Sequence, residues 1–171
     1  MRILGIDPAL TTTGYGVIDC EKNRLSLVEA GIITTTVKQL LPQRLEKIHR
    51  AVTKLIRDTK PQVLVLEKIY SHYRHPTTAF LLGQARGVIC LTCAEAGIPL
   101  VEYPATRVKK AVVGNGQAGK YQVQRMVGSM LRITKLPEYS DVTDALALAI
   151  AHNYIGRNAL NHDSQNLRKT G

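Results

Sequence analysis

The sequence predicts an α/β protein in which helices pack on a mixed β-sheet, and three observations predict this class. Three strand-like segments come first and strands then alternate with helices, an order typical of a mixed sheet covered by helices. The fourth strand-like segment, QVLVLEK, is a short apolar run between turn signals, as in a buried parallel strand. Hydrophobic residues make up 44% of the 171 positions, which is enough for one folded domain with its own core.

The first half of the chain supplies three strands and a helix. Strands are expected at residues 2–7, 14–20 and 24–35, and the polar turn EKN joins the second strand to the third. An amphipathic helix is expected within residues 41–60. Apolar side chains recur there at helical spacing, at Leu45, Ile48, Val52, Leu55 and Ile56.

The second half of the chain alternates strands and helices. Residues 62–68 are the fourth expected strand and residues 99–104 are the fifth. A long helix is expected over about Thr77–Ala96, closed by Gly97. Two shorter helices flank the glycine-rich turn GNGQAGK, and a final helix begins near Ser140.

The charge balance indicates a polyanionic partner. The formal net charge is +10, and nucleic acid is the commonest partner of so basic a domain. A membrane-surface role would need the basic residues on one amphipathic helix, and no segment has that pattern. No apolar run approaches the ~20 residues that span a bilayer, and Asp7 interrupts any signal-peptide core. We therefore expect a cytoplasmic protein that makes no membrane contact.

Three cysteines are too few for a disulfide framework. Cys90 and Cys93 lie inside the apolar helical stretch FLLGQARGVICLTCAEAG. A zinc site would need further ligands, and a thioredoxin-type pair would open a helix instead of lying within one. We expect both to be small core residues.

Four acids have positions that indicate a shared site. Asp7 ends the first strand and Glu67 ends the fourth, and sites in open α/β sheets gather at the carboxyl ends of strands. Asp141 and Asp144 lie three residues apart in the first turn of the final helix, whose ALALAIA segment is apolar almost all round and must be buried. If the two strands are neighbours, the four carboxylates converge.

Clustered carboxylates repel one another, and hard divalent cations relieve that repulsion. Two such ions can activate a water and stabilise a leaving oxygen in phosphodiester hydrolysis. Taken singly, each acid has a simpler explanation: a turn at Asp7, a lysine partner for Glu67, and helix-dipole stabilisation by Asp141 and Asp144. Taken together, they predict a metal site in a nuclease.

Two glycine-rich segments resemble nucleotide-binding loops. GNGQAGKY matches most of the phosphate-loop pattern, but Tyr121 stands where Ser or Thr should hold magnesium. A loop that presents Lys120 to a phosphate is the better interpretation, and a plain surface turn is the alternative. GIDPALTTTGYG is similar to the phosphate hairpin of actin-like and sugar kinases, so a phosphotransferase fragment is kept as an alternative.

The segment KIYSHYRHP carries an aromatic and basic cluster. Tyr70, Tyr73 and Arg74 are suited to base stacking and phosphate contact, whereas His72 and His75 have the spacing of a metal pair. A solvated loop is the equally acceptable alternative to nucleic-acid contact.

Residues 1–154 resemble the RuvC family of bacterial Holliday junction resolvases, within the ribonuclease H-like superfamily. The matching stretches are ILGIDP…TGYGVI, LEKIY, LLGQARGVI, VKKAVVGNGQAGKYQVQRMV and SDVTDALALAIAH. The resemblance implies a ribonuclease H-like, mixed five-stranded sheet with its first three strands antiparallel and helices on both faces. It also implies a single nuclease domain over residues 1–156. The polar composition of residues 157–171 predicts a disordered tail.

The resemblance implies a magnesium-dependent, homodimeric endonuclease of DNA recombination and repair that makes paired, symmetric nicks in four-way DNA junctions. By position, Asp7, Glu67, Asp141 and Asp144 would be the catalytic, metal-binding set. Two Mg²⁺ ions would be bridged by Asp7, and Mn²⁺ could substitute for them. The alternatives are a non-catalytic junction-binding protein and a related nuclease that acts on RNA or on ordinary duplex.

The resemblance also implies contacts with DNA and with protein partners. Tyr70 would stack on a base near the crossover, and Lys109 and Lys120 would contact DNA near the scissile phosphate. The helix that contains LLGQARGVI would form the dimer interface, where Gly83 and Ala85 would allow close approach. An ordinary core helix is the alternative. The branch-migration proteins RuvA and RuvB would be further partners.

Overall fold

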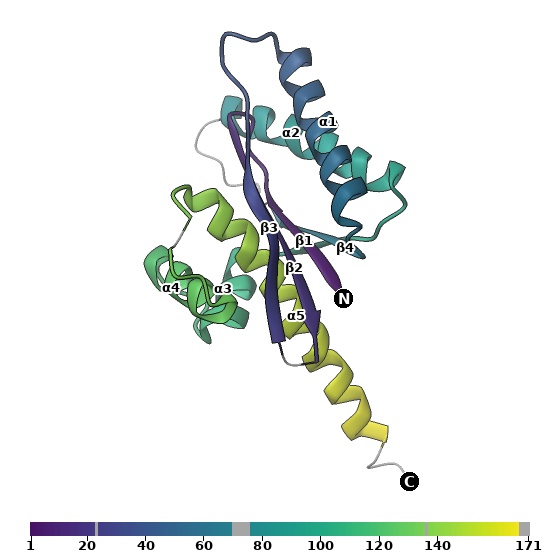
Figure 1. The fold of residues 1–171 in the computed structure, drawn as a ribbon, viewed down its shortest axis with the longest axis vertical. Helices are drawn as coiled ribbons and strands as arrows, with labels where there is room; N and C mark the ends of the chain where they lie inside the picture. Colours follow the sequence, from purple (N-terminus) through teal and green to yellow (C-terminus); the bar gives the residue numbers. More distant parts are fainter. Residues whose placement is uncertain (23, 70–75, 136, 168–171) are drawn as a thin grey trace.

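The five strands form one mixed sheet in the computed structural model, which describes residues 1–22, 24–69, 76–135 and 137–167 (Figure 1). The strand order is β3-β2-β1-β4-β5. The strands are β1 (Arg2–Asp7), β2 (Thr12–Glu21), β3 (Arg24–Thr34), β4 (Val63–Glu67) and β5 (Leu100–Tyr103). All five lie where the sequence predicts them, although β2 is longer at both ends.

The pairing of the strands brings two acids to one edge of the sheet. β1 is antiparallel to β2 and β2 to β3, whereas β1 to β4 and β4 to β5 are parallel pairs. The predicted antiparallel arrangement of the first three strands is therefore confirmed. Ile6 pairs with Leu66, so the next residue of each strand, Asp7 or Glu67, lies at the same carboxyl edge.

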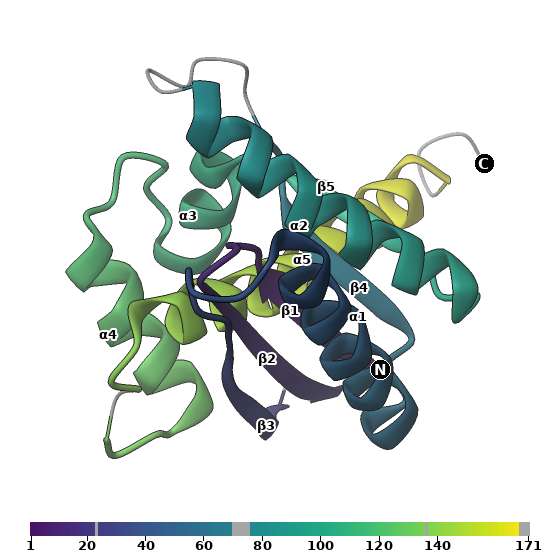
Figure 2. The ribbon, with the colours of Figure 1, turned by 90° about the horizontal axis from the view of Figure 1, so that it is seen from above.

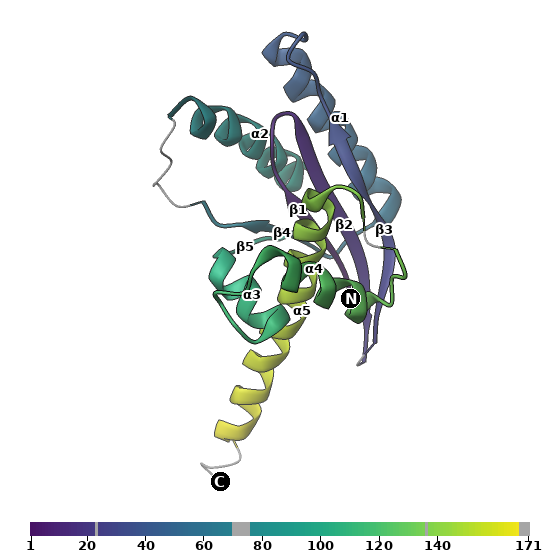
Figure 3. The same cartoon turned by 90° about the vertical axis from the view of Figure 1, so that its left-hand side faces the viewer.

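Helices cover both faces of the sheet, as predicted (Figures 2 and 3). Helices α3, α4 and α5 lie on one face, and α1 and α2 lie on the other. Their bounds are α1 (Leu41–Thr59), α2 (Pro76–Glu95), α3 (Ala105–Val113), α4 (Lys120–Leu131) and α5 (Ser140–Leu167).

Side chains of the central strands alternate between the two hydrophobic cores. In β1, Ile3 belongs to the core under α5, whereas Leu4 and Ile6 belong to the core under α1 and α2. Successive side chains of a strand point to opposite faces, so Asp7 follows Ile3 to the α5 face. Strand β4 alternates in the same way, which places Glu67 on that face as well.

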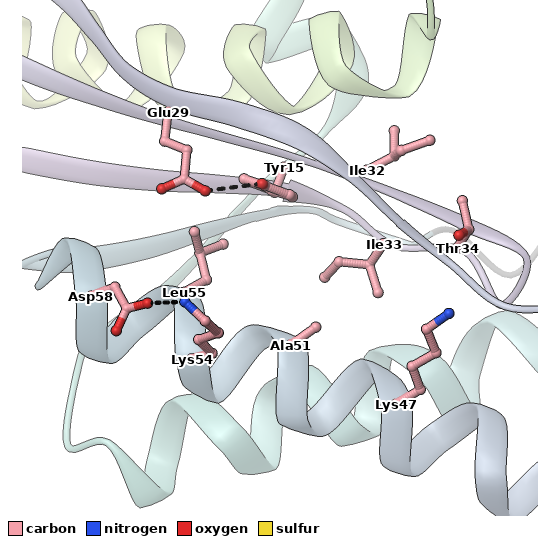
Figure 4. Close-up of a pocket in the computed structure, with 10 residues that line it drawn as sticks. All are labelled: Tyr15, Glu29, Ile32, Ile33, Thr34, Lys47, Ala51, Lys54, Leu55 and Asp58. Atoms are coloured by element: carbon pink, nitrogen blue, oxygen red, sulfur yellow. Dashed lines mark hydrogen bonds and ion pairs between the residues drawn. The ribbon is translucent and has the colours of Figure 1, made fainter.

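Helix α1 and strand β3 enclose a pocket of about 410 Å³ on the face opposite α5 (Figure 4). Tyr15 donates a 3.0 Å hydrogen bond to Glu29 on one wall, and Lys54 pairs with Asp58 on the other. None of the four predicted site acids lines this pocket, so it is separate from the site they form.

One face of helix α2 packs in the core, and its cysteines behave as predicted. Ala85, Ile89 and Cys93 are fully or almost fully buried, and Cys90 packs at the edge of the same core. The burial of Ala85 contradicts its expected place in a dimer interface. It lies on the inner side of the helix, against the sheet.

The opposite face of helix α2 is exposed and apolar. Residues Thr77–Glu95 are long and apolar enough, by length and composition alone, to cross a membrane, with a mean hydropathy of 1.2. The expectation that no run reaches that length is therefore wrong for this helix. A core helix of a soluble protein passes the same test, so this finding is weak evidence for a membrane span.

Helix α5 runs through Leu167, and Figure 1 shows its last turns extending past the sheet. The helix therefore enters the segment predicted as a tail, residues 157–171. The domain boundary at residue 156 stays a prediction.

Candidate active site

Helix α5 reaches the end of the sheet because glycines in the strands leave room for its backbone. A Cβ atom on Gly14 would lie 2.2 Å from the carbonyl oxygen of Asp141, and one on Gly5 would lie 2.0 Å from that of Ala145. Real Cβ atoms essentially never come so close. Gly14 also pairs with Asp7 across the β1–β2 ladder. The first turn of α5 is thus held directly beside Asp7.

The environment of Asp7 favours its protonated form. Burial is the main cause that raises its pKa from 3.8 to about 7, and the charges of Asp144, Asp141 and Glu67 raise it further. Lys120 has the opposite effect. The charges of the other three predicted acids therefore all act on Asp7.

Glu67 lies in the same electrostatic environment as Asp7. Desolvation is the main cause that raises its pKa, and the charge of Asp144 adds to it. Lys109 and Arg86 lower the pKa of Glu67. Two basic side chains therefore partly offset the repulsion among the acids at this end of the site.

Lys120 contacts one of the acids, Asp144, directly. Its Nζ lies 3.0 Å from Oδ2 of Asp144, and this hydrogen bond is the main cause that raises the pKa of Lys120. Lys120 is the first residue of α4, where the amide N–H of Gly119 donates to Oε1 of Gln122 at 2.8 Å. The glycine-rich turn and this local bond place the ammonium group in the site.

Two small cavities meet at Glu67. One, of about 260 Å³, is lined in part by Glu67, Lys109, Lys120 and Asp144. The other, of about 220 Å³, is lined in part by Asp7, Glu67 and Arg86. The acids therefore border open space on both sides of the β4 end, and two lysines border the first cavity.

The carboxylates fit a hard cation chemically, because oxygen ligands from acids are those that Mg²⁺ and Mn²⁺ take. As the side chains stand among the described residues, no three or more His, Cys, Asp and Glu form a group that could hold a metal ion. Lys120 supplies the positive charge beside Asp144 instead. A cation would thus require the carboxylates to turn towards one another.

The structure brings some of the predicted DNA contacts to the acids. Lys109 and Lys120 line the same cavity as Glu67 and Asp144. The other predicted contacts, Tyr70, Tyr73 and Arg74, lie outside the described residues, as do His72 and His75.

Sequence reasoning missed three residues that shape this site. Gly5 and Gly14 let α5 approach the sheet, and Arg86 borders Glu67 from helix α2. Glycines inside predicted strands were a signal for close backbone approach. Arg86 gave no comparable local signal, because its partners lie on β4 and β5.

The structure also bears on the resemblance of GNGQAGKY to a phosphate loop. Such a loop follows a strand, whereas this segment follows helix α3. The missing magnesium-binding hydroxyl at Tyr121 and this helix together rule out the nucleotide-loop interpretation.

Comparisons with known proteins agree on one family. Residues 3–152 match the family model described as Crossover junction endodeoxyribonuclease RuvC. The chain is 46% identical over 158 residues to the crossover junction endodeoxyribonuclease RuvC of Rhodopirellula baltica, covering 92% of this chain and 89% of that protein. It is 44% identical over 152 residues to the protein of the same description from Syntrophomonas wolfei, covering 89% and 88%.

Solved structures show the same likeness. Thermus thermophilus RuvC in complex with a Holliday junction substrate matches with a TM-score of 0.88 and 30% identity, covering 93% of this chain and 96% of that one. The yeast mitochondrial Holliday junction resolvase matches with a TM-score of 0.59 at 11% identity, which shows the shared fold alone. By sequence and by structure, the chain belongs to the RuvC family of crossover junction endodeoxyribonucleases.

Proposed function

We propose that this chain is a structure-specific endonuclease that resolves four-way DNA junctions by paired, symmetric nicks in recombination and repair. The observation that carries the proposal is the gathering of acid charge around Asp7 at the carboxyl edge of the sheet, in a chain of net charge +10. The family supports the reaction, and the T. thermophilus relative was solved with a Holliday junction substrate.

We infer that Asp7, Glu67, Asp141 and Asp144 would hold divalent cations, two Mg²⁺ ions, with Mn²⁺ able to replace them. Burial is the main cause that raises the pKa of Asp7, and the charges of the other three acids raise it further. This acid–acid repulsion supports the inference, because bound cations would relieve it. The cations would supply an activated water and stabilise the leaving oxygen.

Each basic side chain of the site has its own role in this proposal. Lys120, whose Nζ lies 3.0 Å from Oδ2 of Asp144, would present its ammonium group to a phosphate of the DNA. Lys109, on the other wall of the same cavity, adds positive charge near Glu67. Both lysines orient the DNA strand that is cut. Cleavage of that strand leaves a 5′-phosphate end and a 3′-hydroxyl end.

We further propose a homodimer formed through the exposed face of α2. Phe80 is 72% exposed and Leu91 is 55% exposed, and Gly83 and Gly87 lie between them at helical spacing. A Cβ added at either glycine would meet nothing within 4 Å, so both leave room for a partner backbone. A second copy of this face would cover these apolar side chains. The dimer would then place two active sites symmetrically, as symmetric nicks require.

The experiment that tests the function is cleavage of a labelled, mobile four-way junction in Mg²⁺, beside matched linear duplex and RNA–DNA hybrid. Paired nicks in the junction alone, absent with EDTA and sealed by ligase, support a resolvase. Cutting of duplex or hybrid would assign the chain to a nuclease with another substrate. Junction binding without cutting in Mg²⁺ would leave a non-catalytic binding protein.

The cytoplasm, which holds the chromosome in bacteria, is the proposed site of action. The branch-migration proteins RuvA and RuvB stay predicted partners, and a pull-down from purified components tests them.

A further inference from the structure

We propose that Arg86 of helix α2 is a positioning residue that fixes the end of strand β4, and with it Glu67, for cation binding. This inference rests on the proposed function, because it assigns Glu67 its role there. Arg86 belongs to the LLGQARGVI stretch, and its side chain is only 11% exposed.

The contacts of Arg86 reach both parallel strands at the edge of the site. Its Nη1 donates a 2.8 Å hydrogen bond to the backbone carbonyl of Glu67, and its Nη2 forms an ion pair with Oε1 of Glu102 on β5. Glu102 is paired with Leu66 in the β4–β5 ladder, so the two contacts span the last residue pairs of that ladder.

A guanidinium group suits this task because its planar donors are held in a fixed fork. One lysine ammonium could keep the charge, but it could not bridge the carbonyl and the carboxylate in the same geometry. Outer-shell groups that hydrogen-bond to metal-ligating residues typically change metal affinity or activity by about 10–100-fold when they are removed.

The position of Arg86 also links the site to the proposed dimer face. Arg86 lies between Gly83 and Gly87 in the sequence, and its side chain turns from that helix towards the sheet. Close packing of a second copy on α2 would therefore hold the helix from which Arg86 reaches Glu67.

The chain contains a matched control for this contact. Arg2 pairs with Asp19 at 2.8 Å and donates through Nη1 to the backbone carbonyl of Thr59 at 2.6 Å. It thus ties a strand to a helix through the same two kinds of bond, but at the opposite end of β1. Arg2→Gln and Arg86→Gln therefore each remove one ion pair and one hydrogen bond to a backbone carbonyl. Arg86→Gln does so beside Glu67, and Arg2→Gln does so at the other end of β1.

The experiment compares the full-length wild type with Arg86→Gln, Arg86→Lys, Glu102→Gln and Arg2→Gln. Three of the four readouts are thermal stability, Mn²⁺ affinity from the paramagnetic resonance of free Mn²⁺, and hydrogen exchange at the Lys68 amide without metal. That amide donates to the carbonyl of Tyr103 at 2.8 Å and reports the order of the β4 end. Single-turnover cleavage of a four-way junction is the fourth readout.

We expect Arg86→Gln to weaken Mn²⁺ binding and slow cleavage by about tenfold or more and to speed exchange at Lys68. Arg86→Lys and Glu102→Gln should shift the same quantities in the same direction by less. Arg2→Gln should lower thermal stability comparably but change Mn²⁺ affinity and cleavage by less than about twofold.

Equal losses in Arg2→Gln and Arg86→Gln would overturn the inference, because stability alone would then explain them. The inference would also be overturned if Arg86→Lys and Glu102→Gln fold and keep the Mn²⁺ affinity and the Lys68 exchange rate of the wild type. A wild-type protein that binds no Mn²⁺ would overturn it too. A wild type that binds Mn²⁺ but cuts no junction would defeat the proposed function, whereas the affinity and exchange readouts would still test Arg86.

Discussion

At the scale of single residues, Asp7 and Asp19 show that the surroundings of an aspartate can shift its pKa in either direction. Asp7 sits among other acids, and burial with their charges raises its pKa to about 7. Asp19 lies beside Arg2, whose hydrogen bond holds the pKa of Asp19 below its usual range. Asp7 therefore costs the fold stability when ionised, and Asp19 contributes stability when ionised.

The first prediction concerns the stability of the metal-free protein. The folded pKa of Asp7 lies above its unfolded value of 3.8, so the unfolded state loses this proton first as pH rises. The contribution of Asp7 should destabilise the fold progressively from about pH 4 to about pH 7. In EDTA at about pH 8, Asp7→Asn should therefore melt several degrees higher than wild type, and at about pH 4 this gain should vanish.

Asp19→Asn is the matched control for this prediction. It removes an acid whose pKa is lowered in the fold, so it should lower the melting temperature at neutral pH instead of raising it. A melting temperature for Asp7→Asn at or below that of wild type in EDTA would contradict the charge repulsion described around Asp7.

At the scale of elements, the approach of α5 to β1 and β2 determines where Asp141 and Asp144 stand. That approach depends on Gly5 and Gly14, at which a Cβ would collide with helix backbone. A backbone cannot yield as a flexible side chain can, so the helix itself would have to move.

The second prediction is that Gly14→Ala displaces the first turn of α5. We expect it to lower the free energy of unfolding by about 1–3 kcal/mol and to slow junction cleavage by more than that loss explains. Chemical denaturation and single-turnover cleavage of the folded fraction measure the two effects.

Gly31→Ala serves as the control for this substitution. Gly31 also lies in a strand, but its added Cβ would meet the ring and hydroxyl of Tyr15, a side chain that can shift. It should leave cleavage close to wild type. If Gly14→Ala cleaved at the wild-type rate, the close contact of Gly14 with Asp141 would not govern the position of that acid.

At the scale of the whole molecule, the exposed face of α2 determines whether two active sites act together. The third prediction is that Gly87→Glu gives a monomer by sedimentation, because a charged side chain would occupy the space left for a second copy. Each chain should still fold, since a Cβ added at Gly87 meets nothing within 4 Å. Paired nicking of a junction should then be lost.

Val37→Glu is the control for the introduced charge, because Val37 is 80% exposed and lies outside α2. It should leave the assembly state unchanged. A Gly87→Glu protein that sediments like wild type would place the subunit contact elsewhere.

The sequence predicts the fold well where one physical rule governs each element. The sequence places Asp7 and Glu67 at the ends of the first and fourth strands and predicts that they converge if those strands are neighbours, and the structure pairs β1 with β4. The apolar helix with acids in its first turn likewise predicts that Asp141 and Asp144 reach the site.

The sequence predicts less where distant segments must meet. Helix α2 is apolar nearly all round, so its pattern did not distinguish the inner side of Ala85 from the outer side of Gly83 and Gly87. The contacts of Gly14 with Asp141 and of Arg86 with Glu102 join segments far apart in the chain, and no local pattern encodes such pairs.

The most direct test of the central claim measures binding and cleavage of the same four-way junction by wild type and Asp7→Asn. The account predicts equal binding, because the basic side chains and the shape of the DNA determine affinity, and loss of cleavage by about a thousandfold or more, because Asp7 holds the cations. Cleavage by Asp7→Asn close to the wild-type rate, or a loss of binding that explains the loss of cleavage, would contradict it.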